Sequence, residues 1–252
     1  MVRKLCIDLK KMFGNYHIYL CMMSLGFVYI VVYFQTLSSG IYQFGIVSSY
    51  DNIAEGSMVM LVSFLLSIVG GSVFYCAEEK YGYLLFEIQR VGTSVYTISK
   101  VLISLIGGFC TVMVGNIIYL CGILLHRLWI FESISLVGEN IEHMMWLWLF
   151  SALRCGVLSA IGFLISTYIS NYYIAVTVPL LIYYVILELE YWISLYFPMI
   201  PEKFFFTDTY LAGYIEGNDL QEFMFALLYT ACVSVIIYRM AKSRIERRLE
   251  HV

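Results

Sequence analysis

The sequence contains little charge and little proline. Only 13% of its 252 residues are charged and only 3 are proline, and no stretch is rich in Ser, Gly and Pro or in charges of one sign. These scarcities argue against linkers and disordered tails, so we expect a single domain over residues 1–252. A soluble domain of this length could not bury a chain that is 61% apolar and 17% aromatic. The composition therefore predicts an integral membrane protein.

The motifs of common catalytic sites are also missing. The chain has no H-E-x-x-H, no G-x-S-x-G and no G-x-x-x-x-G-K-[ST], so it lacks a P-loop for ATP. Glu78 and Glu79 resemble the start of an E-E-x-x-x-R protease motif, but Tyr83 stands at the arginine position. The 7 cysteines form no C-x-x-C pair and fall in or beside apolar runs, which favours a packing role. We therefore expect neither an enzyme nor a chain that binds a metal or cofactor itself.

Six apolar runs are each about as long as the ~20 residues that cross a bilayer as a helix. We expect transmembrane helices over about 16–36, 57–77, 101–125, 144–169, 173–197 and 220–238. Gly107, Gly108 and Gly115 in the third span offer places for close helix approach. The fold predicted is all-α, with six spans.

Two further segments are predicted to be helical without spanning. Residues 1–13 place Leu5, Leu9, Met12 and Phe13 on one face, which is typical of an interfacial helix. Residues 198–219 are aromatic-rich, bounded by Pro and Gly, and too short and broken for a seventh span. We expect a short external or re-entrant helix there.

The distribution of Lys and Arg predicts the orientation of the spans. With the N-terminus inside, Arg127 and Lys203 fall in outer loops and Arg154 falls in a span, which leaves 12 of the 15 basic residues in inner segments. Inner loops carry the excess of Lys and Arg in membrane proteins. We therefore expect both termini in the cytoplasm.

The segment 76–104, between the second and third spans, is charged and too polar to span. Leu84, Leu85 and Ile88, with Tyr81 one turn earlier, lie on one stripe of a helix, and most of the charged residues lie off it. One interpretation is an ordinary cytoplasmic loop whose amphipathic helix rests on lipid headgroups. The other is a helix that docks on a partner.

The residues of this segment resemble the ABC-2 permease family. The features that carry the resemblance are an acidic pair, a glycine, an apolar helix, a basic residue, a small-residue turn and an aromatic-x-x-Ser-Lys motif. They correspond to Glu78, Glu79, Gly82, 84–88, Arg90, 91–94 and 96–100. Members often have proline after the basic residue, where this chain has Val91 and Gly92, and Gly92 also breaks a helix. The six-span layout extends the resemblance over nearly the whole chain.

The resemblance implies a function and a set of partners. In this family the segment is a coupling helix that sits in a groove of a separate P-loop ATPase, which binds the ATP and Mg²⁺. The ATPase-coupling residues would be Glu78, Glu79, Tyr81, Gly82, Leu84, Leu85, Ile88 and Arg90. A second permease subunit, identical or related, completes the transporter in the bacterial cytoplasmic membrane, and no nucleic acid is involved. Short members often export bacteriocins, lantibiotics or other antimicrobial peptides.

Other functions remain open at this point. Export of a lipid-linked glycan or a drug is an alternative within the same class. An ATPase-independent channel or a membrane assembly factor is the alternative from another class, and a neighbouring gene for a P-loop ATPase would discriminate against it.

One predicted span contains a buried basic residue that requires a partner or water. Arg154 and Glu188 each lie ~14 Å below the outer end of adjacent antiparallel spans, at the ~1.5 Å rise per residue of a helix. A charge in mid-bilayer costs several kcal/mol unless it is paired. We therefore hypothesise an intramembrane ion pair of Arg154 with Glu188, or with Glu190, and alternatively a role of Arg154 in contacting substrate.

Overall fold

The computed structural model describes residues 1–38, 57–80, 82–129, 141–197, 199–200, 205 and 219–250, and these contain helices and no strand. The eight helices among them are α1 (Val2–Phe13), α2 (Tyr16–Ser38), α4 (Ser57–Lys80), α5 (Tyr83–Val91), α6 (Thr93–Trp129), α7 (Ile141–Tyr168), α8 (Tyr172–Tyr196) and α10 (Asp219–Glu250). The predicted outer segment 198–219 lies almost entirely outside the described residues.

A helix covers each of the six predicted spans. Five of the helices, α2, α6, α7, α8 and α10, are long and apolar enough to cross a membrane, which indicates a multi-pass membrane protein. In α4 the apolar stretch is shorter and runs over Met58–Ser72. Helix α6 begins at Thr93, earlier than the predicted residue 101. Gly92 interrupts the helix between α5 and α6, and no proline follows it that would delay the start of α6.

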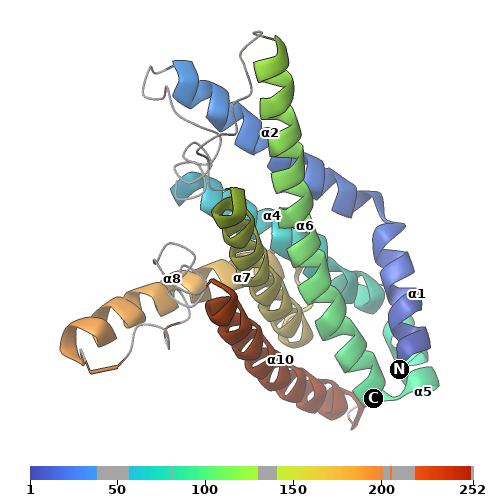
Figure 1. Ribbon diagram of the computed structural model, residues 1–252. Helices are drawn as coiled ribbons and strands as arrows, with labels where there is room; N and C mark the ends of the chain where they lie inside the picture. The colour runs from blue at the N-terminus through green and yellow to red at the C-terminus, as the bar shows by residue number, and fades with distance from the viewer. Residues whose placement is uncertain are drawn as a thin grey trace.

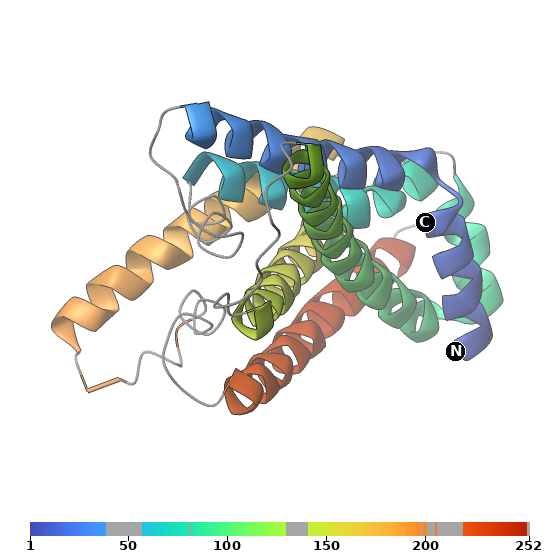
Figure 2. The same ribbon diagram turned by 45° about the horizontal axis from the view of Figure 1, so that its top comes forward.

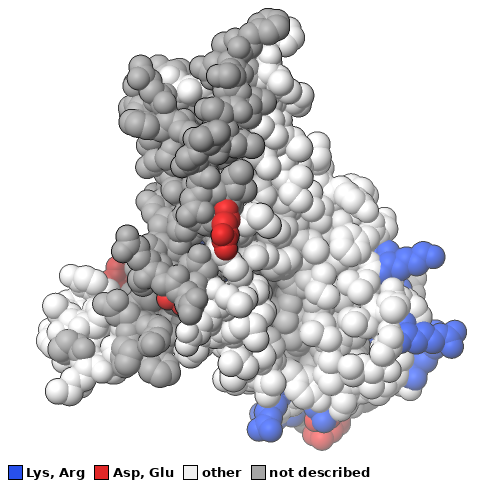
Figure 3. Space-filling view, viewed as in Figure 1, with Lys and Arg blue, Asp and Glu red and all other residues white. Residues whose placement is uncertain are grey.

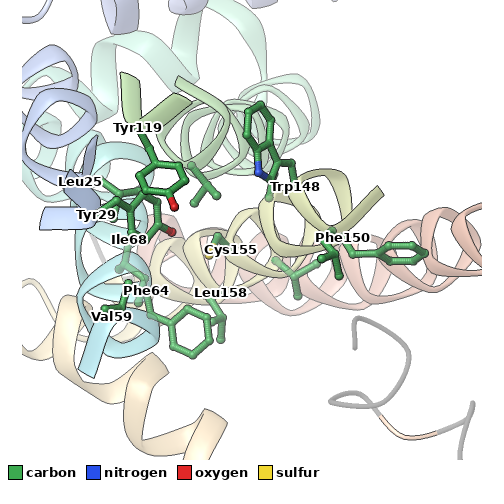
Figure 4. Packing of buried hydrophobic residues seen from close by; sticks show 14 of the residues in the cluster. Leu25, Tyr29, Val59, Phe64, Ile68, Tyr119, Trp148, Phe150, Cys155 and Leu158 are labelled. Carbon is green, nitrogen blue, oxygen red and sulfur yellow. The ribbon is translucent and has the colours of Figure 1, made fainter. Parts of the chain in front are cut away.

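Helix α7 forms the centre of the bundle. In its apolar window 72% of the residues are buried, against 11% in α10, and it packs against α4, α6, α8 and α10. Figure 4 shows side chains from α2, α4, α6 and α7 gathered around this centre. Phe64, Tyr119 and Leu158 are among the fully buried members of this apolar core. Helices α4, α6, α8 and α10 surround α7, and α2 packs on α4 and α6. Helices α2, α6, α8 and α10 expose more of their apolar surface than α7 does, as expected of helices that face lipid.

Small residues let α4, α6 and α7 approach closely. A Cβ atom on Gly107 would lie 2.8 Å from Gly71 Cα, and a Cβ on Gly108 would lie 3.1 Å from Gly156 Cα. Ser104 Oγ donates a hydrogen bond of 3.0 Å to the Gly71 carbonyl oxygen, across the same contact. The expectation that Gly107 and Gly108 mark close helix contacts is confirmed, and small residues with interhelical hydrogen bonds drive helix association in lipid.

The long helices diverge from one end of the molecule. The N-terminus, α1, α5 and the end of α10 lie together at that end, while α8 leans away from the bundle (Figures 1 and 2). Helix α8 packs on α4 and α7, and α10 packs on α6 and α7. The end of the molecule that holds α1, α5 and the C-terminal turns of α10 is called the α5 end below.

Candidate functional site

Helix α5 is a short helix held between two glycines of unusual conformation. Gly82 has φ +72° and Gly92 has φ +81°, both in the region that L side chains adopt only with strain. The Gly82 N–H donates to the Glu79 carbonyl, and the Gly92 N–H donates to the Ile88 carbonyl. The glycines therefore set two sharp changes of direction, and α5 crosses between the ends of the long helices α4 and α6.

The inner face of α5 packs against the end of α10. Ile88 is only 4% exposed and joins an apolar cluster with Tyr96 and Ile245, against which the half-buried Leu84 also packs. A groove of about 220 Å³ runs along this contact, lined from α5 by Leu84, Leu85 and Ile88 and from α10 by Ile245, Arg248 and Leu249. Leu84 and Ile88 thus share one face, as predicted, while Leu85 is 38% exposed at its margin. The predicted fourth member, Tyr81, lies outside the described residues.

The outer face of α5 is aromatic and exposed. Tyr83 is 62% exposed and Phe86 is 73% exposed, and they stand three residues apart on the helix surface. Arg90 is also exposed. Two large exposed aromatic side chains beside a cationic one are the composition that protein interfaces favour.

A network of six charges fixes α5 to its surroundings at the α5 end. It consists of three carboxylates and three ammonium groups, from Lys4, Asp8, Lys11, Glu78, Glu87 and Lys100. Its members come from α1, α4, α5 and α6. The equal numbers of both signs allow several of these groups to be buried without a net charge.

Within the network, Glu87 connects α5 to the N-terminal helix. Its carboxylate accepts a hydrogen bond from Lys4 Nζ and one of 2.8 Å from Lys11 Nζ. Lys4 Nζ also donates to Asp8 at 2.9 Å, and Asp8 accepts a hydrogen bond of 2.7 Å from Ser99 Oγ on α6. Movement of α5 must therefore displace α1 or break the ion pairs of Glu87 with Lys4 and Lys11.

The acidic pair predicted from the sequence separates into two different contacts. Glu78 accepts a hydrogen bond from Tyr96 Oη at 2.7 Å and one from Lys100 Nζ at 2.5 Å, which ties α4 to α6. Glu79 accepts one from Arg248 at 2.6 Å, and Arg248 also donates to the Tyr168 carbonyl oxygen. Glu79 thus joins the end of α4 to the last turns of α10 and, through Arg248, to the end of α7.

The network also changes the protonation of Glu87. Burial alone would raise the pKa of this carboxyl group, but the hydrogen bonds and charges of Lys11 and Lys4 outweigh it and lower the pKa from 4.5 to about 2. Burial would likewise lower the pKa of Lys4, and its contacts with Glu87 and Asp8 raise it instead. Both shifts favour the charged forms that make the ion pairs.

This shift predicts a loss of stability in acid. Because the pKa of Glu87 is lower in the folded state, its stabilisation is complete above pH 4.5 and is lost as the pH falls through about 2. We expect the thermal midpoint of the detergent-solubilised chain to fall more steeply with acid across this window than that of the variant Glu87→Gln. Parallel curves for the two proteins would contradict the assignment.

The structure does not bring Arg154 together with either predicted carboxylate. Arg154 is only 7% exposed, and its guanidinium carbon lies 5.1 Å from the centre of the Phe64 ring. Glu188 is exposed and Glu190 is half-buried on α8, and neither forms an ion pair with Arg154. Equal depth in adjacent helices was not sufficient to bring Arg154 and Glu188 together, because α8 leans away from the bundle (Figure 2). Nε and Nη1 of Arg154 have no hydrogen-bond partner in the part of the chain that the structure describes.

A buried arginine without an ion pair among the described residues should respond to substitution differently from one that forms an ion pair. Arg154→Leu is expected to preserve or raise the thermal midpoint of the chain in detergent, because leucine removes a desolvated charge and retains the contact with Phe64. Adding Glu188→Leu should change the midpoint only additively. A midpoint that falls with Arg154→Leu and recovers in the double variant would restore the ion-pair hypothesis.

Basic side chains gather at the α5 end. Figure 3 shows Lys and Arg over the lower and right-hand parts of the face in view, where α1, α5 and the end of α10 lie in Figure 1. The exposed basic residues of α1 and α5 include Arg3, Lys10 and Arg90. The ion-pair network and the outer face of α5 therefore lie at a predominantly basic end of the molecule.

Comparison with known proteins gives no identification. No family model, curated protein or solved structure matches this chain.

Several residues of this site do not follow from the sequence pattern. Lys4 and Asp8 lie outside the apolar face predicted for residues 1–13, but they are buried together with Met12 because partners on α5 and α6 satisfy their charges. Tyr83 and Phe86 were not singled out, although their spacing of three places them beside each other on a helix. That aromatic pair was the available signal for an outer contact face.

Proposed function

We propose that this chain is the permease subunit of an ATP-driven ABC transporter of the ABC-2 type. The single observation that carries the proposal is the construction of α5: a short crossing helix with exposed Tyr83 and Phe86 outside and ion pairs inside. A partner that moves α5 would move α1 directly through Glu87, and α4 and α6 through the chain on either side. A helix that only rests on a membrane surface has no need of such a connection.

The arrangement of the helices is consistent with the rest of the proposal. Helix α4, whose apolar stretch is short, would act as the second of six spans. The basic α5 end would face the cytoplasm, because Lys and Arg concentrate on that side of membrane proteins. Both termini would then be cytoplasmic, in the bacterial cell membrane.

The partner would supply the chemistry that this chain lacks. A separate P-loop ATPase would bind ATP and Mg²⁺ and contact the outer face of α5, and closure of its dimer would displace that helix. A second permease subunit, identical or related, would complete the transporter. We propose export of an antimicrobial peptide or another amphipathic substrate.

Copurification tests the proposal. We expect a P-loop ATPase to copurify with the tagged chain from its native membrane in mild detergent, with ATPase activity in the complex. Phe86→Asp should abolish copurification, because it places a carboxylate in the centre of the apolar contact, and Phe86 is too exposed for the change to unfold the bundle.

A matched variant controls for a general effect of charge. Ile7→Asp introduces the same carboxylate at a 43% exposed apolar position on α1, at the same end of the molecule, and should retain the ATPase. If no nucleotide-binding protein copurifies with the wild-type chain, or if Phe86→Asp retains it fully, the proposal is wrong.

A further inference from the structure

Three arginines on the last turns of α10 surround a cavity next to the end of α7. The cavity has a volume of about 320 Å³ and is lined by Tyr168, Arg239, Met240, Ser243, Arg244 and Arg247. These six residues are called the arginine cavity. No carboxylate lines it, and it is separate from the groove between α5 and α10, which follows the opposite face of the same helix end.

The three guanidinium groups lack counter-charges in the part of the chain that the structure describes. Of the acidic side chains at this end of α10, Glu79 pairs with Arg248 and Glu246 pairs with Lys242 at 3.7 Å, while Glu250 is exposed and forms no ion pair among the described residues. Arg239, Arg244 and Arg247 form no ion pair among the described residues. Among the described residues, the cavity is therefore lined by three arginines without an ion-pair partner.

Arg244 is fixed in place although it has no acidic partner. It is half-buried, its guanidinium carbon lies 5.3 Å from the centre of the Tyr168 ring, and its buried Nε has no hydrogen-bond partner among the described residues. A buried donor without an acceptor is destabilising. Stacking on an aromatic ring holds the planar guanidinium group in a position from which it can donate hydrogen bonds to a ligand.

The position of the cavity along α10 indicates which kind of molecule would carry the hydrogen-bond acceptor. Arg239 is the first basic residue after the apolar run that ends at Tyr238, so the cavity begins where this helix would leave the hydrocarbon. Met240, 45% exposed, adds an apolar surface to the lining. A site that is cationic on one side and apolar on the other fits an amphipathic anion.

We infer that the arginine cavity binds the phosphate group of an anionic phospholipid headgroup. Arginine forks bind phosphate oxygens with paired hydrogen bonds, and basic pockets between helices at the membrane surface bind anionic headgroups. The exposed Met240 contacts the start of the acyl chain. The inference requires only that α10 crosses a membrane, so it holds or fails independently of the ATPase partner.

Lipid titration of the purified full chain tests the inference. Micelles of dodecyl maltoside containing phosphatidylglycerol or phosphatidylcholine are the two probes, with bound lipid counted by native mass spectrometry. We expect one phosphatidylglycerol to bind in preference to phosphatidylcholine. Arg239→Gln with Arg247→Gln should weaken its binding about 30-fold, because each basic residue contributes about fivefold to anionic-lipid binding. Both side chains are exposed, so this variant folds.

The control removes the same charge elsewhere at the α5 end. Arg3→Gln with Lys10→Gln changes two exposed basic residues of α1, outside the cavity, and should leave the affinity within about twofold of the wild type. Equal losses in the two variants would mean that diffuse charge attracts the lipid and would overturn the inference, as would equal binding of the two lipids. Displacement of phosphatidylglycerol by excess inorganic phosphate would reassign the cavity to a soluble phosphate and overturn the lipid assignment.

Discussion

Gly108→Val is expected to abolish the folded bundle. A Cβ atom at position 108 would lie 2.7 Å from the Cys155 carbonyl oxygen and 3.1 Å from Gly156 Cα, both in the backbone of α7. Backbone atoms of a central helix cannot move aside as a flexible side chain can, so α6 and α7 would have to separate. We expect a destabilisation of about 3 kcal/mol or more, at or beyond the upper end of typical overpacking costs. Size-exclusion chromatography in mild detergent would show little monodisperse protein.

Another glycine of α6 supplies the matched control. A Cβ atom on Gly122 would meet Ile30 Cδ1 at 2.6 Å, which is the mobile end of a side chain. Gly122→Ala should therefore change the monodisperse yield little, because Ile30 can adopt another rotamer. A wild-type yield for Gly108→Val would contradict the close packing of α6 and α7.

Asp8→Ala should produce the second large effect. Asp8 is 3% exposed, accepts hydrogen bonds from Lys4 and Ser99, and lies 3.8 Å from Lys100 Nζ. Its removal leaves the six-charge network with one excess positive charge in a buried position. Breaking a buried ion pair in this way costs about 3–5 kcal/mol. The thermal midpoint in detergent should fall well below that of the wild type.

Two further variants distinguish loss of the network from a local effect on α1. Lys10→Ala, at an exposed position on the same helix without an ion pair among the described residues, should leave the midpoint unchanged. Lys4→Met combined with Asp8→Ala should recover part of the lost stability, because it restores the charge balance. If the double variant is less stable than Asp8→Ala alone, charge balance is not what Asp8 provides.

Local features of the structure could be predicted from the sequence. The positions of the long helices could be predicted from the apolar runs, because each run is about as long as the ~20 residues that cross a bilayer as a helix. The pattern predicts Leu84, Leu85 and Ile88 on one face of a short helix; in the structure Ile88 is buried, Leu84 is half-buried and Leu85 is 38% exposed. Each of these predictions depends on residues close together in the chain.

Contacts between distant parts of the chain could not be predicted in the same way. Lys4 and Glu87 are 83 residues apart, and Glu79 and Arg248 are 169 residues apart. Such pairs depend on how the helices cross, which the spacing of residues does not specify. The structure likewise shows no ion pair of Arg154 with Glu188, because matching depth does not determine whether two helices lean together.

Photo-crosslinking from α5 tests the proposed coupling most directly. A photoreactive amino acid at position 86, in place of the exposed Phe86, would be activated in intact membranes and the adducts identified by mass spectrometry. Position 129 is the control, because Trp129 is 84% exposed at the opposite end of α6 (Figure 1). The account predicts an adduct between position 86 and a P-loop ATPase, and none from position 129. Adducts from position 86 with lipid alone would contradict it.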